Sequence, residues 1–383
     1  MTAMNEPKTL TDDEKAEIHQ VSRQFQTTGR FGSVVYCPGG HINKSFFVTW
    51  QLEDRDIRHF HQRINTNVFH DPEALMNNIA MITSHLSRKL LAQGETERAW
   101  RVLTVIPTRA GALFWRAPNG DVWRTYAAID NATNHPYASS PSIAFEAGKA
   151  FGKFQELLLD FPSGTLAESI PGFLNTRKRF DDFLTAIQND GSNRARLVRP
   201  EIEWVRKREH LSDVLSTAIT ANEIPLRVSH NDAKLDNVLF ERESESALAI
   251  VDLDTVMDGS PLYDCGDMIR TMTSTSAEDD LCLNNVQMRM PLFEALFRGY
   301  LSCARSFLSE RELSLIIVSG KMIAFIIGVR FLTDFLNGDR YFHVSRPEHN
   351  LERCRTQFRL VQSIEEQEVQ MEKCLRQIWN ETL

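Results

Sequence analysis

Val228-Ser-His-Asn-Asp-Ala-Lys-Leu-Asp-Asn-Val-Leu-Phe240 sets a run of polar residues between two short apolar segments, and this stretch decides the fold. A further apolar segment, residues 247–251, follows it and leads directly into Asp252. Short apolar segments bounded by turn-forming residues are typical of buried strands. We therefore expect the polar residues to form a tight loop between strands, with side chains that share one site with Asp252.

The loop carries His230, Asp232, Lys234 and Asn237 in the order His-x-Asp-x-Lys-x-x-Asn. Phosphoryl transfer from ATP needs a carboxylate that orients and deprotonates the acceptor hydroxyl, and oxygen ligands that hold Mg²⁺ against the phosphates. The pattern resembles the catalytic loop of protein kinases and of the aminoglycoside phosphotransferase superfamily. The resemblance implies that Asp232 is the base, that Lys234 contacts the transferred phosphate and that Asn237 binds the metal. Our candidate catalytic residues are His230, Asp232 and Lys234.

Asp252 matches the aspartate of the kinase Asp-Phe-Gly motif, which bridges Mg²⁺ to the phosphates. Leu253 and Asp254 stand in place of Phe and Gly, which is typical of small-molecule phosphotransferases and argues against a protein kinase. We expect Asp254 to be a second metal ligand or a group that supports one. His, Asp and Asn are also common in solvated turns, but their joint spacing here is far more specific than any one of them.

The composition of the 383 residues, 42% apolar and 25% charged, is ordinary for a soluble globular enzyme. A net charge of −8 argues against a nucleic-acid or anionic-membrane partner, because both favour basic surfaces. The six cysteines form no Cys-x-x-Cys pair, so we expect reduced thiols rather than a zinc cluster or a disulfide framework. No signal segment is evident, and the most apolar stretch, 313–331, is interrupted by Ser, Gly and Lys. We expect a buried helix there and a cytoplasmic protein.

The first third of the chain alternates as strands do, and one helix is expected to begin at Asp71-Pro72. Strands are predicted at 33–37, 45–50, 57–64, 102–106, 112–115 and 122–129. Beyond a turn-rich stretch, helical spacing predicts helices at 143–161, 174–189, 199–220, 262–275, 287–308, 311–336 and 347–379. The predicted fold class is α+β, a protein-kinase-like fold of two lobes. Residues 1–129 form the N-lobe with an antiparallel sheet that binds nucleotide, 130–142 the hinge, and 143–383 a helical C-lobe with the catalytic loop and the acceptor pocket.

Gly39 and Gly40 lie between the first two predicted strands and are candidates for a turn whose backbone N–H groups cover the ATP phosphates. An ordinary tight turn has the same composition. Protein kinases also carry a lysine on the third strand, paired with a glutamate on the following helix. Here Gln62 takes the place of the lysine, with Arg63 beside it, and Ala80 stands where the glutamate is expected.

Arg63 and Lys44 are the candidates for the missing positive charge, although strand alternation leaves the side to which each points open. A solvated surface arginine is the alternative for Arg63. Ala127 and Ile129, at the end of the last strand before the hinge, are further candidates for nucleotide contact. The predicted nucleotide contacts are thus Gly39, Gly40, Gln62, Arg63, Ala127 and Ile129.

Sequence blocks spread over most of the chain are similar to those of bacterial N-acetylhexosamine 1-kinases, anomeric sugar kinases within the aminoglycoside phosphotransferase superfamily. The blocks are Gly40-His-Ile-Asn43, Gln62-Arg-Ile-Asn-Thr66, Arg227-Val-Ser-His-Asn-Asp-Ala-Lys-Leu-Asp-Asn237, Ile250-Val-Asp-Leu-Asp-Thr-Val256, Gly266-Asp267 with Arg270, Arg330-Phe-Leu-Thr-Asp334, Gly338-Asp-Arg-Tyr-Phe342 and Pro347-Glu-His-Asn350. This resemblance implies transfer of the ATP γ-phosphate, with Mg²⁺, to the anomeric hydroxyl of an N-acetylhexosamine such as N-acetylglucosamine or N-acetylgalactosamine. The family tends to lack the strand lysine, whereas Ala80 remains a departure.

Position by position, the resemblance implies that His41, Arg330 and Tyr341 contact the sugar, with Asp232 at its O1. Arginine and tyrosine suit a sugar because they hydrogen-bond to hydroxyls and stack on rings. The alternatives are a paired charge on an apolar helix for Arg330, a cap on the core for Tyr341 and a solvated turn for His41. Asp267 is expected to brace the catalytic loop, and a helix cap is its alternative.

Three other functions compete with this prediction. A kinase of the same superfamily acting on choline, homoserine, methylthioribose or an aminoglycoside is the nearest. Gln62 and Ala80 leave room for a pseudokinase that binds nucleotide without catalysis, although Asp232, Asn237 and Asp252 are intact. A metal-dependent hydrolase is also conceivable from the carboxylates, but nearby histidine ligands are scarce.

Overall fold

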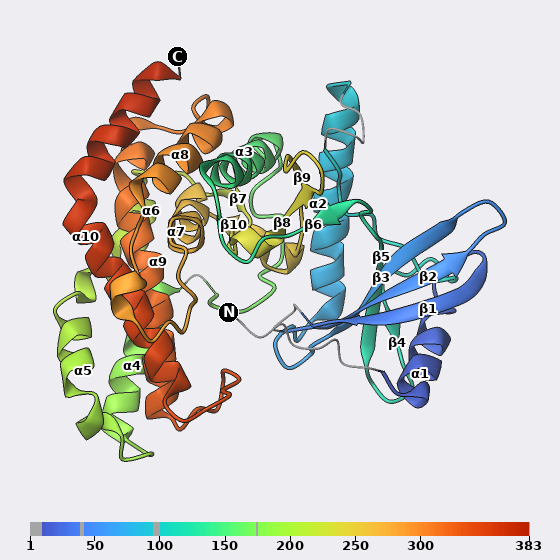
Figure 1. The fold of residues 1–383 in the computed structure, drawn as a ribbon, viewed down its shortest axis with the longest axis horizontal. Helices are drawn as coiled ribbons and strands as arrows, with labels where there is room; N and C mark the ends of the chain where they lie inside the picture. Colours follow the sequence, from blue (N-terminus) through green and yellow to red (C-terminus); the bar gives the residue numbers. More distant parts are fainter. Residues whose placement is uncertain (1–9, 39–41, 95–99, 174, 383) are drawn as a thin grey trace. The chain divides into compact units, whose positions relative to one another are not determined.

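The computed structural model describes residues 10–38, 42–94, 100–173 and 175–382 (Figure 1). These residues belong to two compact units, which we call unit 1 and unit 2. Unit 1 comprises Met1–Ala132, Thr165–Ile170 and Leu253–Val256, and unit 2 comprises Thr133–Gly164, Pro171–Asp252 and Met257–Leu383. The chain passes from the first to the second within the short β6 (Ala132–Thr133).

Unit 1 is built on a five-stranded antiparallel sheet with the strand order β1-β2-β3-β5-β4. The strands are β1 (Arg30–Cys37), β2 (Lys44–Gln51), β3 (Asp56–Ile64), β4 (Trp115–Arg116) and β5 (Val122–Ala127). Alternate residues of β2 are buried in a core with the side chains of helix α1, as expected for a sheet with one covered face. The buried members of this core are Leu10, Ile18, Val21, Phe25, Phe46, Val48, Trp50 and Trp123.

Two helices complete unit 1. The predicted helix is confirmed as α2 (Pro72–Ala92), with Asp71 as its N-cap and Pro72 in its first turn. The helix α1 (Asp12–Ser22) was not predicted, because its sequence carries few apolar residues; a capping box between Thr11 and Glu14 starts it.

The strand predicted at 102–106 is wrong. This segment runs beside β5 with isolated contacts such as the bridge between Val105 and Tyr126, and Pro107, which has no N–H, follows it. The strand predicted at 112–115 shrinks to the two residues of β4.

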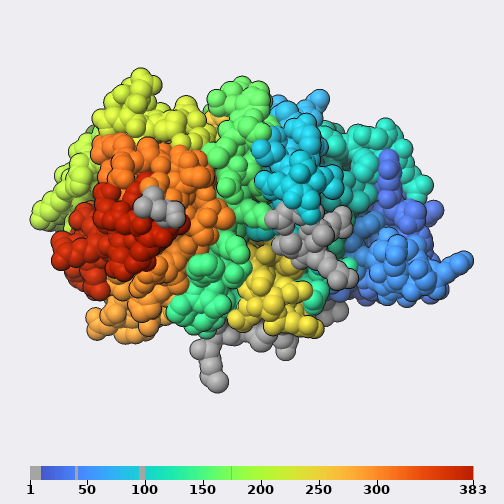
Figure 2. Space-filling view, turned by 90° about the horizontal axis from the view of Figure 1, so that it is seen from above, coloured from blue at the N-terminus to red at the C-terminus, as the bar shows by residue number. Residues whose placement is uncertain are grey.

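Unit 2 is mainly helical. Its helices are α3 (Pro141–Leu157), α4 (Thr176–Asn189), α5 (Arg199–Arg206), α6 (Val214–Thr220), α7 (Pro261–Met272), α8 (Met290–Ala304), α9 (Glu310–Leu336) and α10 (His349–Glu381). The single helix predicted over 199–220 is broken into α5, a 3₁₀ turn and α6. Figure 2 shows the last helices, coloured orange to red, forming one continuous surface. An antiparallel sheet followed by a mainly helical region was predicted, and this order is confirmed.

Small strands of unit 2 flank the polar loop within Val228–Phe240. β7 (Arg227–Ser229) pairs antiparallel with β10 (Met257–Gly259), and β8 (Val238–Glu241) pairs antiparallel with β9 (Ala247–Ile250). The predicted strands on both sides of the polar loop are therefore confirmed.

α3 and α8 pack against each other with their backbones in contact. A Cβ atom on Gly148 would lie 2.1 Å from the carbonyl oxygen of Leu296, and one on Gly299 would lie 2.0 Å from that of Phe145. Only glycine fits these positions at the observed helix separation.

α9 is long and apolar enough to cross a membrane by length and composition, but 72% of its most apolar window is buried inside the protein. It is the predicted core helix. All six cysteines lie within the described residues, and no disulfide joins them there.

Candidate active site

The predicted catalytic loop joins β7 to β8 in unit 2. Asn231 in this loop has φ of +64°, and Asp252, which follows β9, has φ of +61°. Left-handed backbone costs free energy in residues other than glycine, and such residues are concentrated at functional sites. Val251 N–H donates to Asn237 O at 2.9 Å, so the metal-ligand candidates Asn237 and Asp252 lie on adjacent backbones.

A buried carboxylate on α7, Asp264, holds the loop by its backbone. It accepts hydrogen bonds from the N–H groups of His230 at 3.0 Å and Asn231 at 2.7 Å. Gln155 on α3 donates to the same carboxylate at 2.7 Å and accepts from the Tyr300 hydroxyl of α8 at 2.6 Å. Burial raises the pKa of Asp264, whereas the hydrogen bonds that it accepts act to lower that pKa. The loop is thus tied to the α3–α8 helix pair.

The bracing role predicted for Asp267 stays a prediction, because the hydrogen bonds to the loop backbone come from another residue. The Asp267 carboxylate accepts from Arg270 Nε at 2.7 Å, and the hydrogen bonds to the loop backbone come from Asp264, one turn earlier on α7. Burial raises the pKa of Asp267, the charge of Arg270 acts against it, and the charge of Asp232 raises it further. The signal for Asp264 was its place in the first turn of a predicted helix, where a carboxylate is common.

His230, one of the predicted catalytic residues, is fully buried. Its Nε2 lies 3.0 Å from Val251 O, and its ring meets the rings of Phe151 and Phe154 edge-on. These contacts join the catalytic loop to the segment before Asp252. The structure therefore places His230 among the groups that position the loop.

Asp232, Lys234 and Asn237 lie together, as predicted. Lys234 Nζ is 2.8 Å from Asp232 Oδ2, and Asn237 Nδ2 donates to the same oxygen at 3.1 Å and to Asp232 O at 2.8 Å. Burial acts to raise the pKa of Asp232, but Lys234, with His230 and Arg270, outweighs it and lowers that pKa. Asp232 is therefore ionised at neutral pH, the state that a general base needs.

Asn237 and Asp252 fit a Mg²⁺ ion that is shared with phosphates. The Asn237 amide donates to Asp232, so its Oδ1 is the atom turned away as an oxygen ligand. Burial acts to lower the pKa of Lys234, but the charges of Asp232 and Asp252 outweigh it and raise that pKa. Over the described residues there is no group of three or more His, Cys, Asp or Glu side chains that could hold a metal by itself. Mg²⁺ in phosphoryl-transfer sites typically takes one or two protein ligands, with water and phosphate completing its shell.

Asp254, the third metal-ligand candidate, lies in unit 1 and has other partners. Its carboxylate forms a bidentate ion pair with Arg124 of β5, at 2.5 and 2.9 Å, and accepts from Asn43 at 2.9 Å. Arg124 was not among the predicted site residues. Of the two roles expected for Asp254, these contacts favour that of a supporting group.

The predicted nucleotide contacts are spread over unit 1. Gln62 is hydrogen-bonded to Arg124 at 3.0 Å and to Ser45 at 3.0 Å. Arg63 pairs with Asp121 at 2.9 Å, so its charge is already compensated within the sheet. Lys44 begins β2, Ala127 ends β5 and Ile129 follows it, both of the latter half-buried. Gly39, Gly40 and His41 lie outside the described residues.

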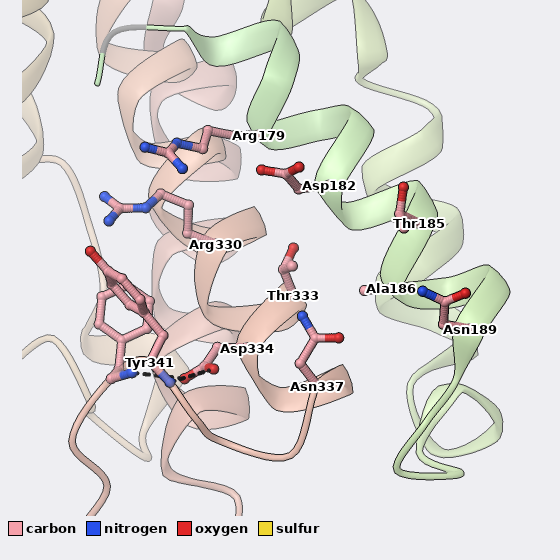
Figure 3. Close-up of a pocket in the computed structure, with 11 residues that line it drawn as sticks. Arg179, Asp182, Thr185, Ala186, Asn189, Arg330, Thr333, Asp334, Asn337 and Tyr341 are labelled. Carbon is pink, nitrogen blue, oxygen red and sulfur yellow. Dashed lines mark hydrogen bonds between the residues drawn. The ribbon is translucent and has the colours of Figure 1, made fainter. Parts of the chain in front are cut away.

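Arg330 and Tyr341, the sugar-contact candidates, line a cavity of about 380 Å³ in unit 2. Figure 3 shows Arg179 of α4 beside Arg330 of α9, with the Tyr341 hydroxyl turned toward Arg330. Hydroxyl and amide groups complete the polar wall, namely Thr185, Asn189, Thr333 and Asn337. Arg179 and α4 were not part of the predicted site.

The two carboxylates of this cavity are already engaged. Asp182 pairs with Lys178 at 2.8 Å. Asp334 is buried and accepts from the N–H groups of residues 340, 341 and 342 and from Asn350, each at 2.9 Å. Asp334 thereby fixes the backbone that carries Tyr341.

The two arginines of the cavity, by contrast, form no ion pair with any residue in the described part of the chain. Burial lowers the pKa of Arg330, and Tyr341 acts to raise this pKa. The charges of Arg179 and Arg270 lower it further. The charge of Arg270 also acts to lower the pKa of Asp232. The cavity is therefore polar, and it presents two guanidinium groups without an ion-pair partner among the described residues.

Comparisons with known proteins agree with this geometry. The model of the phosphotransferase enzyme family matches residues 47–305. A spectinomycin phosphotransferase, solved with ADP and spectinomycin, is similar with a TM-score of 0.56 and 14% identity, covering 89% of this chain and 94% of that chain. A choline kinase from Cryptosporidium parvum is similar with a TM-score of 0.54 and 15% identity, covering 90% of this chain and 92% of that chain. An aminoglycoside phosphotransferase from Alicyclobacillus acidocaldarius is similar with a TM-score of 0.53 and 12% identity, covering 100% of this chain and 99% of that chain. At these identities the likeness shows the fold, and the predicted kinase-like fold is confirmed.

Proposed function

This chain belongs to the phosphotransferase enzyme family, and we propose that it transfers the γ-phosphate of ATP to the anomeric hydroxyl of an N-acetylhexosamine. The acceptor cavity carries the proposal, because its two arginines have no carboxylate partner among the described residues. The anomeric position and the N-acetyl group rest on the sequence blocks around Asn43, Arg330 and Tyr341.

The charge of the cavity separates this acceptor from those of similar kinases. Choline and aminoglycosides are cations, and a pocket that binds them needs carboxylates or an aromatic cage. Here Arg179 and Arg330 repel a cation, whereas Asp182 is paired with Lys178 and the Asp334 oxygens accept hydrogen bonds from backbone N–H groups and Asn350. A polyhydroxylated sugar instead accepts hydrogen bonds from the guanidinium groups and stacks on the Tyr341 ring.

The catalytic loop supplies the chemistry of the transfer. Asp232, ionised beside Lys234, accepts the proton of the sugar hydroxyl as the oxygen attacks the γ-phosphate. Lys234 lies where it balances the charge that moves with the phosphate. Asn237 and Asp252 would hold Mg²⁺, which neutralises phosphate charge when bound with ATP.

The test is an acceptor panel with Mg·ATP, read out by ADP release and by NMR of the product. The panel contains N-acetylglucosamine, N-acetylgalactosamine, glucose, choline, homoserine, methylthioribose and an aminoglycoside. We expect the highest kcat/KM with an N-acetylhexosamine, and phosphorus coupling to C1 in the product. Phosphate on C6, or turnover with only a cationic acceptor, would overturn the proposal.

A further inference from the structure

A buried polar cluster in unit 1 occupies the place where kinases keep a lysine and a glutamate. Arg124 of β5 is directly opposite Gln62 of β3 in the sheet register, and its side chain is only 1% exposed. Arg124 Nε donates to Gln62 Oε1 at 3.0 Å, while its two terminal nitrogens bind Asp254 at 2.5 and 2.9 Å. Arg124 of the neighbouring strand thus places a positive charge beside Gln62, the β3 position at which kinases carry the lysine.

The carboxylate of the kinase ion pair also comes from a different segment, since α2 lacks the expected glutamate. Over its full length α2 carries a single acidic residue, Glu73 in its first turn, and the helix lies against the short turn that follows Asp252. That turn, Leu253–Thr255, presents Asp254 as the carboxylate. An arginine and an aspartate therefore form the ion pair that Gln62 and Ala80 preclude.

Further hydrogen bonds connect this pair to the rest of the unit. Asn43, just before β2, donates to Asp254 at 2.9 Å and accepts from Asn65 N–H, just after β3, at 3.0 Å. Gln62 also donates to Ser45 at 3.0 Å. The cluster thus holds together β2, β3, β5 and the segment after Asp252.

Burial of such a pair calls for a reason beyond stability. Taking two charges out of water costs about as much free energy as their attraction returns, so apolar residues serve stability as well. What a bidentate, fully hydrogen-bonded pair adds is a fixed geometry. Here the pair fixes Asp254, two positions after Asp252. Asp252 itself has φ of +61°, a left-handed conformation that needs support from its surroundings.

We propose that Arg124 is a positioning residue that, through Asp254, holds Asp252 in place for Mg·ATP, in the role of the kinase lysine–glutamate pair. The proposal rests on the proposed ATP-dependent transfer. It makes Asp254 a partner of Arg124 and not a metal ligand, and it requires that both members of the pair act on the same property of the enzyme.

The experiment compares Arg124→Met, Asp254→Asn and the double variant. Steady-state assays give kcat, KM for ATP and the Mg²⁺ concentration for half-maximal rate, and a fluorescent ATP analogue reports binding with and without Mg²⁺. Each single variant is expected to raise the Mg²⁺ requirement and to lower kcat about tenfold or more. The double variant is expected to be no worse than the singles, because they break one interaction. Binding of the analogue without Mg²⁺ is expected to persist.

Three results would overturn the proposal. A Mg²⁺ effect in Asp254→Asn alone would make Asp254 a metal ligand. Loss of Mg²⁺-free analogue binding in Arg124→Met alone would make Arg124 a phosphate contact. A lower melting temperature with unchanged kinetics would make the pair purely structural.

Arg208→Met is the matched control. Arg208 forms a bidentate pair with Glu365 in unit 2, at 2.9 and 2.8 Å, and also covers an aromatic ring. Its loss is expected to lower stability with kinetics unchanged. Arg124→Lys, which keeps the charge but not the fork, is the second variant if Arg124→Met fails to fold, and it is expected to recover part of kcat. The binding arms use no acceptor, so they stand even if the acceptor proves to be another alcohol.

Discussion

Two aspartates with cationic partners, one in each unit, show how the same pairing serves different ends. In unit 1, Asp254 and Arg124 are 4% and 1% exposed, and two terminal nitrogens grip the carboxylate. In unit 2, Asp232 and Lys234 are 28% and 27% exposed and meet through one nitrogen. We infer that the sealed pair, Arg124–Asp254, fixes a geometry, whereas the open pair, Asp232–Lys234, is partly accessible to solvent.

The choice of arginine in one pair and lysine in the other agrees with these two roles. The planar fork of arginine matches a carboxylate at two points and loses little freedom, whereas the ammonium of lysine is a point charge on a flexible stem. A group that follows a phosphate during transfer needs the second property. A group that defines backbone position needs the first.

The largest expected effect comes from the open pair. Asp232→Asn keeps the size of the side chain but removes its basicity, so kcat should fall by roughly 10²–10⁴. Acceptor binding, measured by calorimetry, should stay near normal, as should the melting temperature. A variant that keeps more than half of the wild-type kcat would remove Asp232 as the base.

The sealed pair should dominate stability instead. Asp254→Ala leaves Arg124 buried without its carboxylate, which should lower the free energy of unfolding by about 3–5 kcal/mol. Asp232→Ala should lower it by no more than about 1 kcal/mol, because that pair is partly solvated. Urea unfolding of the two variants measures both values, and equal losses would erase the distinction between the pairs.

The smallest effect concerns pH. Lys234 lowers the pKa of Asp232, and the base works only when ionised, so activity is lost as pH falls through that pKa. Lys234→Met removes the positive charge and raises the pKa, so the acid limb of kcat/KM should move to higher pH. Arg124→Met should leave the position of this limb unchanged. A pH profile of both variants decides the matter, and a shift with Arg124→Met would contradict it.

The catalytic loop was predictable because its information is local. Strand, polar loop and strand follow one another within residues 226–252, and the structure brings Asp232, Lys234 and Asn237 together as their spacing indicated. The start of α2 was predictable for the same reason, since cap and proline adjoin the helix.

The partners of these groups were not predictable, because they come from distant segments. Asp254 meets Arg124 across 130 positions, and Gln155 meets Asp264 across 109. A hint was present in β5, where Arg124 stands among buried apolar residues and so calls for a buried counter-charge. Nothing local distinguishes Arg179 on α4 from an ordinary surface arginine.

One wall of the cavity at Arg330 and the hydrogen bonds that support the catalytic loop come from different helices. The loop is braced from α3, α7 and α8, whereas one wall of the cavity is presented by α4, with Asp182, Thr185 and Asn189 on it. Substitutions in α4 therefore leave the hydrogen bonds behind Asp232 untouched. Under the proposed function, we therefore expect substitutions in α4 to alter the choice of acceptor more than the rate of the chemistry, so that substrate range can change while activity is kept.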